Sequence, residues 1–131
     1  MRQLAPLFAL AVAVLPAAAG DGLSRYLWEK RPIIIFADSS EDQLFRRQME
    51  LLAEETEELE ERDVVVLVDT DPGISSALRK ELRPRGFQLV LVGKDGAVKL
   101  RKSRPWTVRE LSRVIDKMPT RQQEIRQRWG R

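Results

Sequence analysis

Three aspartates that follow predicted strands are the residues whose type and spacing could support chemistry. Asp38 comes directly after an apolar run at residues 33–37, and Asp69 and Asp71 come after a second run at residues 64–68. Ligands of open α/β sheets bind at the carboxyl ends of the strands, where three carboxylates could hold Mg²⁺ or Ca²⁺. No complete metal-binding loop surrounds them, and Asp is common at strand ends and as a helix cap. We therefore favour structural roles for them and keep a metal-dependent enzyme as an alternative.

The chain of 131 residues contains no Cys and no His, which excludes several classes of enzyme. Without Cys there is no thiolate nucleophile, disulfide or cysteine-bound zinc, and without His there is no Ser-His-Asp triad or imidazole metal site. Ser39 and Ser40 thus lack a histidine partner, and Ser40 is expected to cap a helix. The Gly-containing turn at residues 93–96 lacks the spacing of a phosphate-binding loop. We expect a protein that is not an enzyme and needs no cofactor.

The first 19 residues have the pattern of a secretory signal peptide. Arg2 supplies a positive charge, an apolar stretch runs from Leu4 to Leu15, and alanines at residues 17–19 give a small-residue cleavage pattern. The apolar stretch is shorter than the roughly 20 residues that a spanning helix needs. We expect an exported protein, periplasmic or secreted, that is soluble after cleavage; an uncleaved N-terminal anchor is the alternative.

Four strands are predicted in the rest of the chain. Three β-branched, continuously apolar runs are typical of strands buried on both faces, and one alternating basic run is typical of a sheet edge. They lie at residues 33–37, 63–69, 87–92 and 97–101. An Asp-Gly turn joins the last two strands as a hairpin.

Helices are predicted between and after these strands. Apolar residues at helical spacing indicate helices at residues 41–61, from 71 to about 82, and at 108–118. Capping boxes are expected at residues 40–43 and 107–110, and Pro119 is expected to end the last main helix. A polar helical tail is expected at residues 120–131.

The order of these elements, βαβαββα, predicts an α/β fold of the thioredoxin-like sandwich type. Such a sandwich has a mixed four-stranded sheet with helices on both faces. The intervening helices favour parallel pairing of the first three strands. We expect one domain at residues 20–126 with its core at about 22–119. Thioredoxins carry a Cys pair after the first strand, where this chain has residues 38–41 and no sulfur.

Charge is separated along the chain. Residues 20–78 carry a net charge of −9 and residues 79–131 a net charge of +11. We favour neutralisation of the two halves across one small domain, with a dipolar surface that steers a partner or pairs with a second copy as the alternative. The basic half has no row of aromatic side chains for base stacking, and we expect no nucleic-acid partner.

Three sequence stretches resemble a known family. They cover residues 62–65, 87–101 and 116–124, within a match over about residues 22–126. The family is a domain of unknown function in short exported bacterial proteins and in animal sushi-repeat-containing and coiled-coil-domain-containing matrix proteins. The resemblance implies a thioredoxin-like, peroxiredoxin-related fold, and it brings no catalytic residues. It marks the following motif positions: Lys94, Asp95, Lys99, Arg101, Asp116, Pro119 and Arg121.

The motif contains a Lys-x-Arg pair for which the sequence offers no structural reason. Lys99 and Arg101 share one face of the predicted edge strand, and Arg121 follows a helix end, where a cation is favoured. We interpret these three residues as a binding surface for a partner protein or an anionic component of the envelope or extracellular space. A structural homo-oligomer built on the charge separation is a further alternative.

Overall fold

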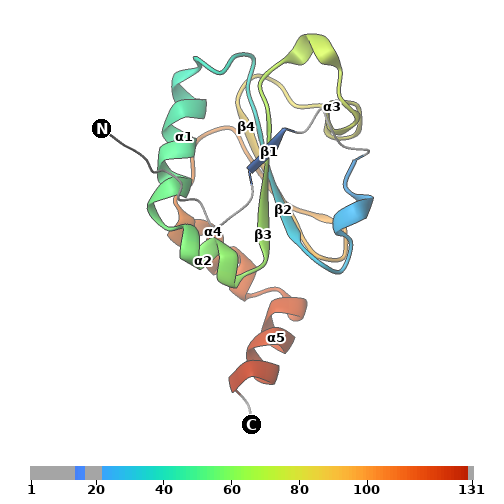
Figure 1. Cartoon of the computed structure of the whole chain (residues 1–131), viewed down its shortest axis with the longest axis vertical. Coiled ribbons are helices and arrows are strands. Elements are labelled where there is room, and N and C mark those ends of the chain that lie inside the picture. The colour runs from blue at the N-terminus through green and yellow to red at the C-terminus, as the bar shows by residue number, and fades with distance from the viewer. Residues whose placement is uncertain (1–13, 17–21, 130–131) are drawn as a thin grey trace, which may run out of the picture.

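The computed structural model describes residues 14–16 and 22–129, and a mixed sheet forms its centre (Figure 1). Its strands are β1 (Val14–Pro16), β2 (Arg31–Phe36), β3 (Val64–Asp69), β4 (Gln88–Val92) and β5 (Val98–Lys102), in the order β1-β3-β2-β4-β5. β1 and β2 run parallel to β3, whereas β4 is antiparallel to β2 and β5 is antiparallel to β4. The four predicted strands are confirmed, and β1 is an addition.

β1 lies within the predicted signal peptide. Most of that segment, including the cleavage pattern at residues 17–19, lies outside the described residues. The signal peptide and its removal therefore stay predictions. Among the described residues, no helix is both long and apolar enough to cross a membrane.

The direction of β4 corrects the expected parallel arrangement of the first three strands. The only α-helix between β3 and β4 is α3 (Ala77–Leu82), with six residues and therefore a length of about 9 Å. A strand of six residues such as β3 extends about 20 Å. Because α3 is too short to return the chain to the starting end of β3, β4 begins where β3 ends and runs in the opposite direction.

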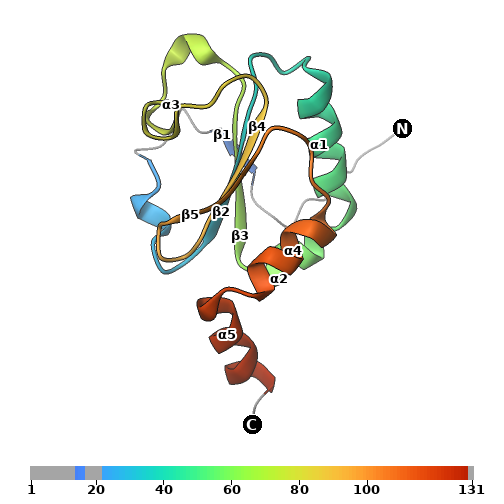
Figure 2. The same cartoon turned by 180° about the vertical axis from the view of Figure 1, so that it is seen from behind.

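Helices cover both faces of the sheet, as predicted. α1 (Gln43–Glu54), α2 (Thr56–Glu61) and α4 (Val108–Asp116) lie on one face and α3 on the other, as Figures 1 and 2 show. Ile33 and Ile35 of β2 point into the core beneath the first group, and Ile34 and Phe36 point into the core beneath α3. This alternation explains why β2 is apolar at every one of these positions.

Three predicted helix boundaries change in the structure. The helix expected at residues 41–61 is broken at Glu55, and its cap is Asp42, whose carboxylate accepts a hydrogen bond from the Phe45 backbone N–H (3.0 Å); the box expected at Ser40 does not form. Asp71 caps only a 3₁₀ turn, η3 (Pro72–Ile74), and α3 begins after Ser76. The capping box at residues 107–110 is confirmed.

The polar tail forms the helix α5 (Pro119–Trp129), which projects beyond the sheet at the bottom of Figures 1 and 2. Pro119 thus follows the end of α4 and also begins the next helix, where its missing N–H and fixed φ are tolerated. The base of α5 faces the end of the sheet where β2 starts, because Glu124 binds Arg31. This contact builds the site described next.

Candidate functional site

The three aspartates considered as cation ligands make separate contacts in the structure. Asp69 is buried and accepts hydrogen bonds from the Ser76 hydroxyl and from Arg79 Nε (2.9 Å). Asp71 is exposed and accepts a hydrogen bond from the Gly73 backbone N–H, and Asp38 is exposed. In the part of the chain that the structure describes, no group of three or more acidic side chains could hold a metal ion. The structural interpretation of Asp69 and Asp71 is therefore supported.

The loop where thioredoxins carry their Cys pair holds no reactive arrangement. The Ser39 hydroxyl accepts a hydrogen bond from the Glu41 backbone N–H (3.0 Å), and Ser40 is exposed. Beneath the loop, Arg79 Nη2 donates to the backbone carbonyl of Ala37 (2.7 Å) and holds the ends of β2 and β3 together. The chain has no Cys at this position or elsewhere, so it carries no thiol redox chemistry of its own.

A buried ion-pair network, here called the closing network, lies where β2 and β3 begin. Arg31, with none of its surface exposed, donates to both carboxylate oxygens of Glu124 (3.2 and 3.0 Å) and to the Arg62 carbonyl (2.8 Å). Lys94 Nζ lies 2.7 Å from Glu124 and 2.8 Å from Asp63. The members of the closing network are Arg31, Glu58, Glu61, Arg62, Asp63, Lys94, Asp116, Arg121 and Glu124.

Arg121 belongs to this network and not to an exposed surface. It is 3% exposed, and its guanidinium binds Asp116 (3.2 Å) and Glu61 (3.0 Å). Arg62 binds the same Asp116 carboxylate through two hydrogen bonds of 3.0 and 2.9 Å. The structure therefore separates Arg121 from Lys99 and Arg101, and three motif positions (Lys94, Asp116 and Arg121) have structural roles.

The closing network also accounts for part of the charge separation along the chain. Asp63 and Glu61 of the acidic half pair with Lys94 and Arg121 of the basic half. Arg31, a cation within the acidic half, pairs with Glu124, a carboxylate within the basic half. Most of these partners are at least half buried, so their attraction is screened less by salt than that of surface pairs. The expected neutralisation across one domain is thus seen in specific contacts.

The carboxylates held by arginines make stability depend on pH. Burial alone would raise the pKa of Asp116, but hydrogen bonds and the positive charges of Arg62 and Arg121 outweigh it and hold this pKa below its ordinary value. Burial alone would also raise the pKa values of Glu124 and Asp69. Arg31 and Lys94 lower that of Glu124, and Ser76 and Arg79 lower that of Asp69.

We therefore expect the protein to lose stability in acid. Because these pKa values are lower in the folded chain, the ionised carboxylates stabilise the fold fully above about pH 5, and this stabilisation is lost as the pH falls through the folded-state pKa values. Urea unfolding at pH 7, 5, 4 and 3 measures it. An unfolding free energy that stays constant or rises from pH 5 to pH 3 would contradict the assignment of these pairs.

Lys99 and Arg101 lie on the exposed edge strand, as predicted. Arg101 Nη1 donates to the Leu82 carbonyl and to the Gln88 side chain (both 2.7 Å), and Lys99 Nζ lies 2.9 Å from Asp95. A β-bulge disturbs the pairing of β4 and β5 beside Lys99. The sheet order places β5 at one end, so no strand of the described residues pairs with its outer side.

Two further cations extend this edge. Lys102 and Arg104 lie 5.2 and 6.0 Å from the centre of the Trp106 ring, within reach of a cation–π attraction. Buried Gln48 of α1 fixes Trp106 by hydrogen bonds to its backbone N–H (2.9 Å) and carbonyl (2.8 Å). We call Lys99, Arg101, Lys102 and Arg104 the basic edge; it is the candidate functional site.

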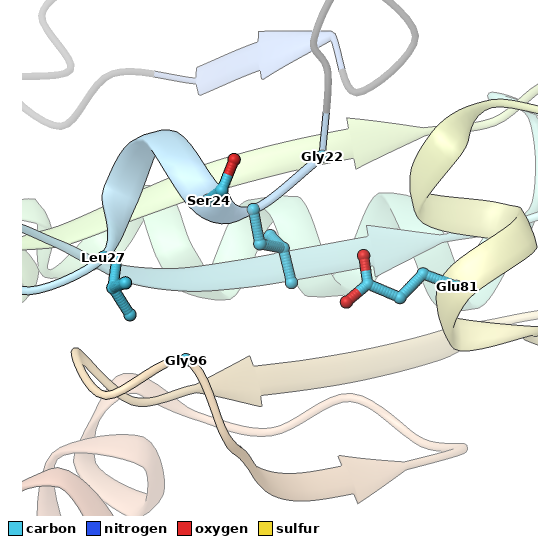
Figure 3. Close-up of a pocket in the computed structure, with 6 residues that line it drawn as sticks. Gly22, Ser24, Leu27, Glu81 and Gly96 are labelled. Carbon is cyan, nitrogen blue, oxygen red and sulfur yellow. The ribbon is translucent and has the colours of Figure 1, made fainter.

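A separate hollow near the start of the domain lacks the groups of a binding site. Figure 3 shows Ser24 and Leu27, from the segment around the 3₁₀ turn η2 (Ser24–Tyr26), opposite Glu81 of α3 and Gly96 of the β4–β5 turn. Its volume is about 280 Å³, and Glu81 is its one charged residue. Because few polar groups converge there, it does not compete with the basic edge.

Sequence reasoning missed Arg31, Arg62, Glu124 and Gln48. Gln48 could have been found, because it lies three residues after Phe45 and four before Leu52 and so interrupts the buried side of α1. Arg31 and Glu124 are 93 residues apart along the chain, Arg62 and Asp116 are 54 apart, and no local pattern links either pair.

The chain is similar in sequence to a protein family and to a curated animal protein. The pattern of the family described as "Domain of unknown function (DUF4174)" matches residues 22–124. Coiled-coil domain-containing protein 80 of Danio rerio is 30% identical over 140 residues, which cover 84% of this chain and 16% of that protein. The chain therefore spans about one sixth of the curated relative.

Solved structures share its fold at low sequence identity. Reduced Plasmodium vivax 2-Cys peroxiredoxin aligns with a TM-score of 0.62 at 14% identity, over 77% of this chain and 84% of that one. Chloroplastic thioredoxin z aligns with a TM-score of 0.55 at 18% identity, over 85% and 96% of the two chains. These likenesses confirm the predicted thioredoxin-like fold.

Proposed function

This chain belongs to the DUF4174 family, and from that premise we propose that it is an exported, non-enzymatic binding module whose basic edge binds an acidic segment of a partner protein. The fold supplies the scaffold, and the absence of Cys removes the thiol chemistry that the scaffold supports in thioredoxins. Export rests on the predicted signal peptide. Among the possible functions, binding is the one that the exposed motif residues Lys99 and Arg101 support best.

The observation that carries this proposal is the charge of the basic edge. Within the described residues only Lys99, of the four cations, forms an ion pair, and its partner Asp95 is exposed. Arg101 and Lys102 are held in place by contacts that leave their charges uncompensated. Uncompensated cations on an ordered strand favour an acidic partner and speed its association.

The structure of β5 favours a partner that is a protein segment and is selected by its charge. The bulge beside Lys99 and the lysines themselves are features that discourage pairing with arbitrary strands. The positive charges that disfavour other strands attract a partner segment with acidic residues. This difference allows such an edge to discriminate between partners. Anionic polymers, whether membrane-bound or soluble, share only the negative charge of such a segment. Their binding is a separate outcome of the test.

Charge reversal on the basic edge tests the proposal. We expect a synthetic peptide rich in Glu to bind in low salt, and we expect Lys99→Glu with Arg101→Glu to weaken binding at least tenfold, or about 1.4 kcal/mol. Fluorescence anisotropy measures the affinity, and a thermal melt shows that the variant folds. The matched control is Arg109→Glu with Arg113→Glu on exposed positions of α4, which changes the net charge equally.

The control gives the result its meaning. We expect the α4 variant to change the affinity less than twofold. An equal loss in both variants would show binding to overall charge and would overturn the assignment to the basic edge. Tighter binding of an anionic polysaccharide such as heparin than of the peptide would overturn the choice of a protein partner. Sedimentation of the protein alone in low salt tests whether it forms a homo-oligomer. A monomer would contradict that alternative.

A further inference from the structure

Trp28 is a large aromatic side chain presented to solvent. It is 62% exposed and lies in the connection between η2 and β2. Its backbone N–H donates to the Lys94 carbonyl (2.7 Å), which fixes its position against the β4–β5 turn. The indole therefore stands on an anchored backbone although it is exposed.

The backbone of Trp28 is strained. Its φ is 65°, in the left-handed region that bulky residues rarely adopt. Glycine or asparagine would adopt this conformation at lower energy. Strain of this kind persists where surrounding contacts enforce it, and it is concentrated at ligand-binding positions. The contacts of Trp28 thus hold its backbone in a conformation that costs energy for a tryptophan.

Two hollows lie beside this indole. The larger, of about 210 Å³, is lined by Trp28, Lys94, Thr120, Gln123, Glu124 and Gln127. The smaller, of about 170 Å³, shares Trp28, Lys94 and Thr120 with it. Its other lining residues are Gly93, Asp95, Lys99, Met118 and Pro119, of which Lys99 and Asp95 form an ion pair. α5 supplies residues 120, 123, 124 and 127 from one side of the helix.

The charges at the base of the larger hollow are already compensated. Lys94 and Glu124 bind each other, and Glu124 also binds Arg31. The Thr120 hydroxyl accepts a hydrogen bond from Arg31 (3.1 Å). The amides of Gln123 and Gln127 are exposed and form no hydrogen bond within the described residues. The hollow therefore offers an aromatic surface, two free amides and a hydroxyl to a ligand without net charge.

A pyranose ring has the complementary chemistry. One of its faces is made of C–H groups that pack on an indole, and its hydroxyls both donate and accept hydrogen bonds, as do the Gln amides. An apolar surface with a few convergent polar groups is the usual form of a small-ligand site. A purely apolar ligand would leave the amides unused, and an anion would meet Glu124.

We propose that Trp28 and the α5 side chains Gln123 and Gln127 form a binding site for a neutral saccharide. The larger hollow contains no residue of the basic edge, and the smaller hollow shares only Lys99 with it. The site goes beyond the protein-binding function proposed above. The indole packs on one sugar ring, and the two amides bind its hydroxyls. The smaller hollow accommodates part of a neighbouring ring.

Binding of neutral oligosaccharides of β-linked glucose and of β-linked N-acetylglucosamine tests this site. We expect calorimetry or saturation-transfer NMR to detect binding in about the millimolar range. Trp28→Ala should weaken it at least tenfold, and Gln123→Ala with Gln127→Ala about fivefold. Trp129→Ala is the matched control, because Trp129 is also exposed, at 72%, but lies outside both hollows. We expect it to have no effect.

The variants also separate this proposal from the first one. The glutamine variant removes two exposed side chains that form no hydrogen bond among the described residues, so it stays informative if Trp28→Ala unfolds. Absence of binding by both oligosaccharide series, or an equal loss in Trp129→Ala, would overturn the saccharide site. Loss of acidic-peptide binding in Trp28→Ala, without any saccharide binding, would assign the hollow to the protein partner and overturn this proposal alone.

Discussion

Glu124→Gln is expected to lower the free energy of unfolding by about 3 kcal/mol, because it removes the countercharge of a fully buried arginine. Arg31 is not exposed at all and binds Glu124 through two hydrogen bonds, and Lys94 binds the same carboxylate. Gln keeps the size of the side chain and one hydrogen-bond acceptor, so the loss reports mainly the charge. For a domain of this size Tm should fall by at least about 10 °C, and urea unfolding at pH 7 measures the free energy.

Glu57→Gln on α2 is the control for this substitution. Glu57 is exposed and forms no ion pair among the described residues, so its free-energy change should stay within about 0.5 kcal/mol. The difference between Glu124→Gln and the unsubstituted protein should also shrink in acid, as the pH falls through the lowered pKa of Glu124. Equal effects of the two substitutions, or a difference independent of pH, would contradict the closing network.

The parts of the fold that the sequence predicted are those set by local patterns. The capping box at Thr107 and Glu110 forms because both hydrogen bonds close within four residues. The hairpin before β5 forms because the turn around Asp95 and Gly96 fits a tight reversal; the Asp95 carboxylate accepts from the Ala97 N–H, and Gly96 has a φ of 85°. Such features depend on neighbours in sequence and need no knowledge of the rest of the molecule.

The break at Glu55 follows from a local pattern that the continuous helix predicted at residues 41–61 does not take into account. Between Leu52 and Leu59 no apolar side chain continues the buried side of the helix, and Glu54 and Glu58 are like charges four residues apart. Helix propensity alone favours continuation through these residues. The absence of a packing contact in this turn, together with repulsion, allows the chain to bend so that Leu59 reaches the core.

The candidate site was only partly predictable for a different reason. The exposed position of Lys99 and Arg101 follows from strand alternation, which is local. The burial of Arg121 follows from Glu61, 60 residues away, and from the docking of α5 against the start of β2. A charged residue that follows a helix end is usually exposed, and only the tertiary structure shows that this one is surrounded by carboxylates.

Asp69→Asn is expected to lower the free energy of unfolding by about 2 kcal/mol, because Arg79 then loses its countercharge where its side chain is only 10% exposed. Burial favours the neutral form of Asp69, but Ser76 and Arg79 keep its pKa low, so the carboxylate is charged at pH 7. Asp71→Asn is the matched control: Asn caps a turn as well as Asp does, and the change should stay within about 0.5 kcal/mol.

The sign of these effects decides between a structural carboxylate and a cation site. If Asp38, Asp69 and Asp71 formed a cation site, neutralising one of them would relieve repulsion in the metal-free protein and raise its stability. It would also weaken the rise of Tm that a bound cation produces by mass action. We expect the reverse, a loss of stability in Asp69→Asn alone and a Tm that Mg²⁺ and Ca²⁺ leave unchanged. The reason is that Arg79 already occupies the position in which a cation would neutralise Asp69.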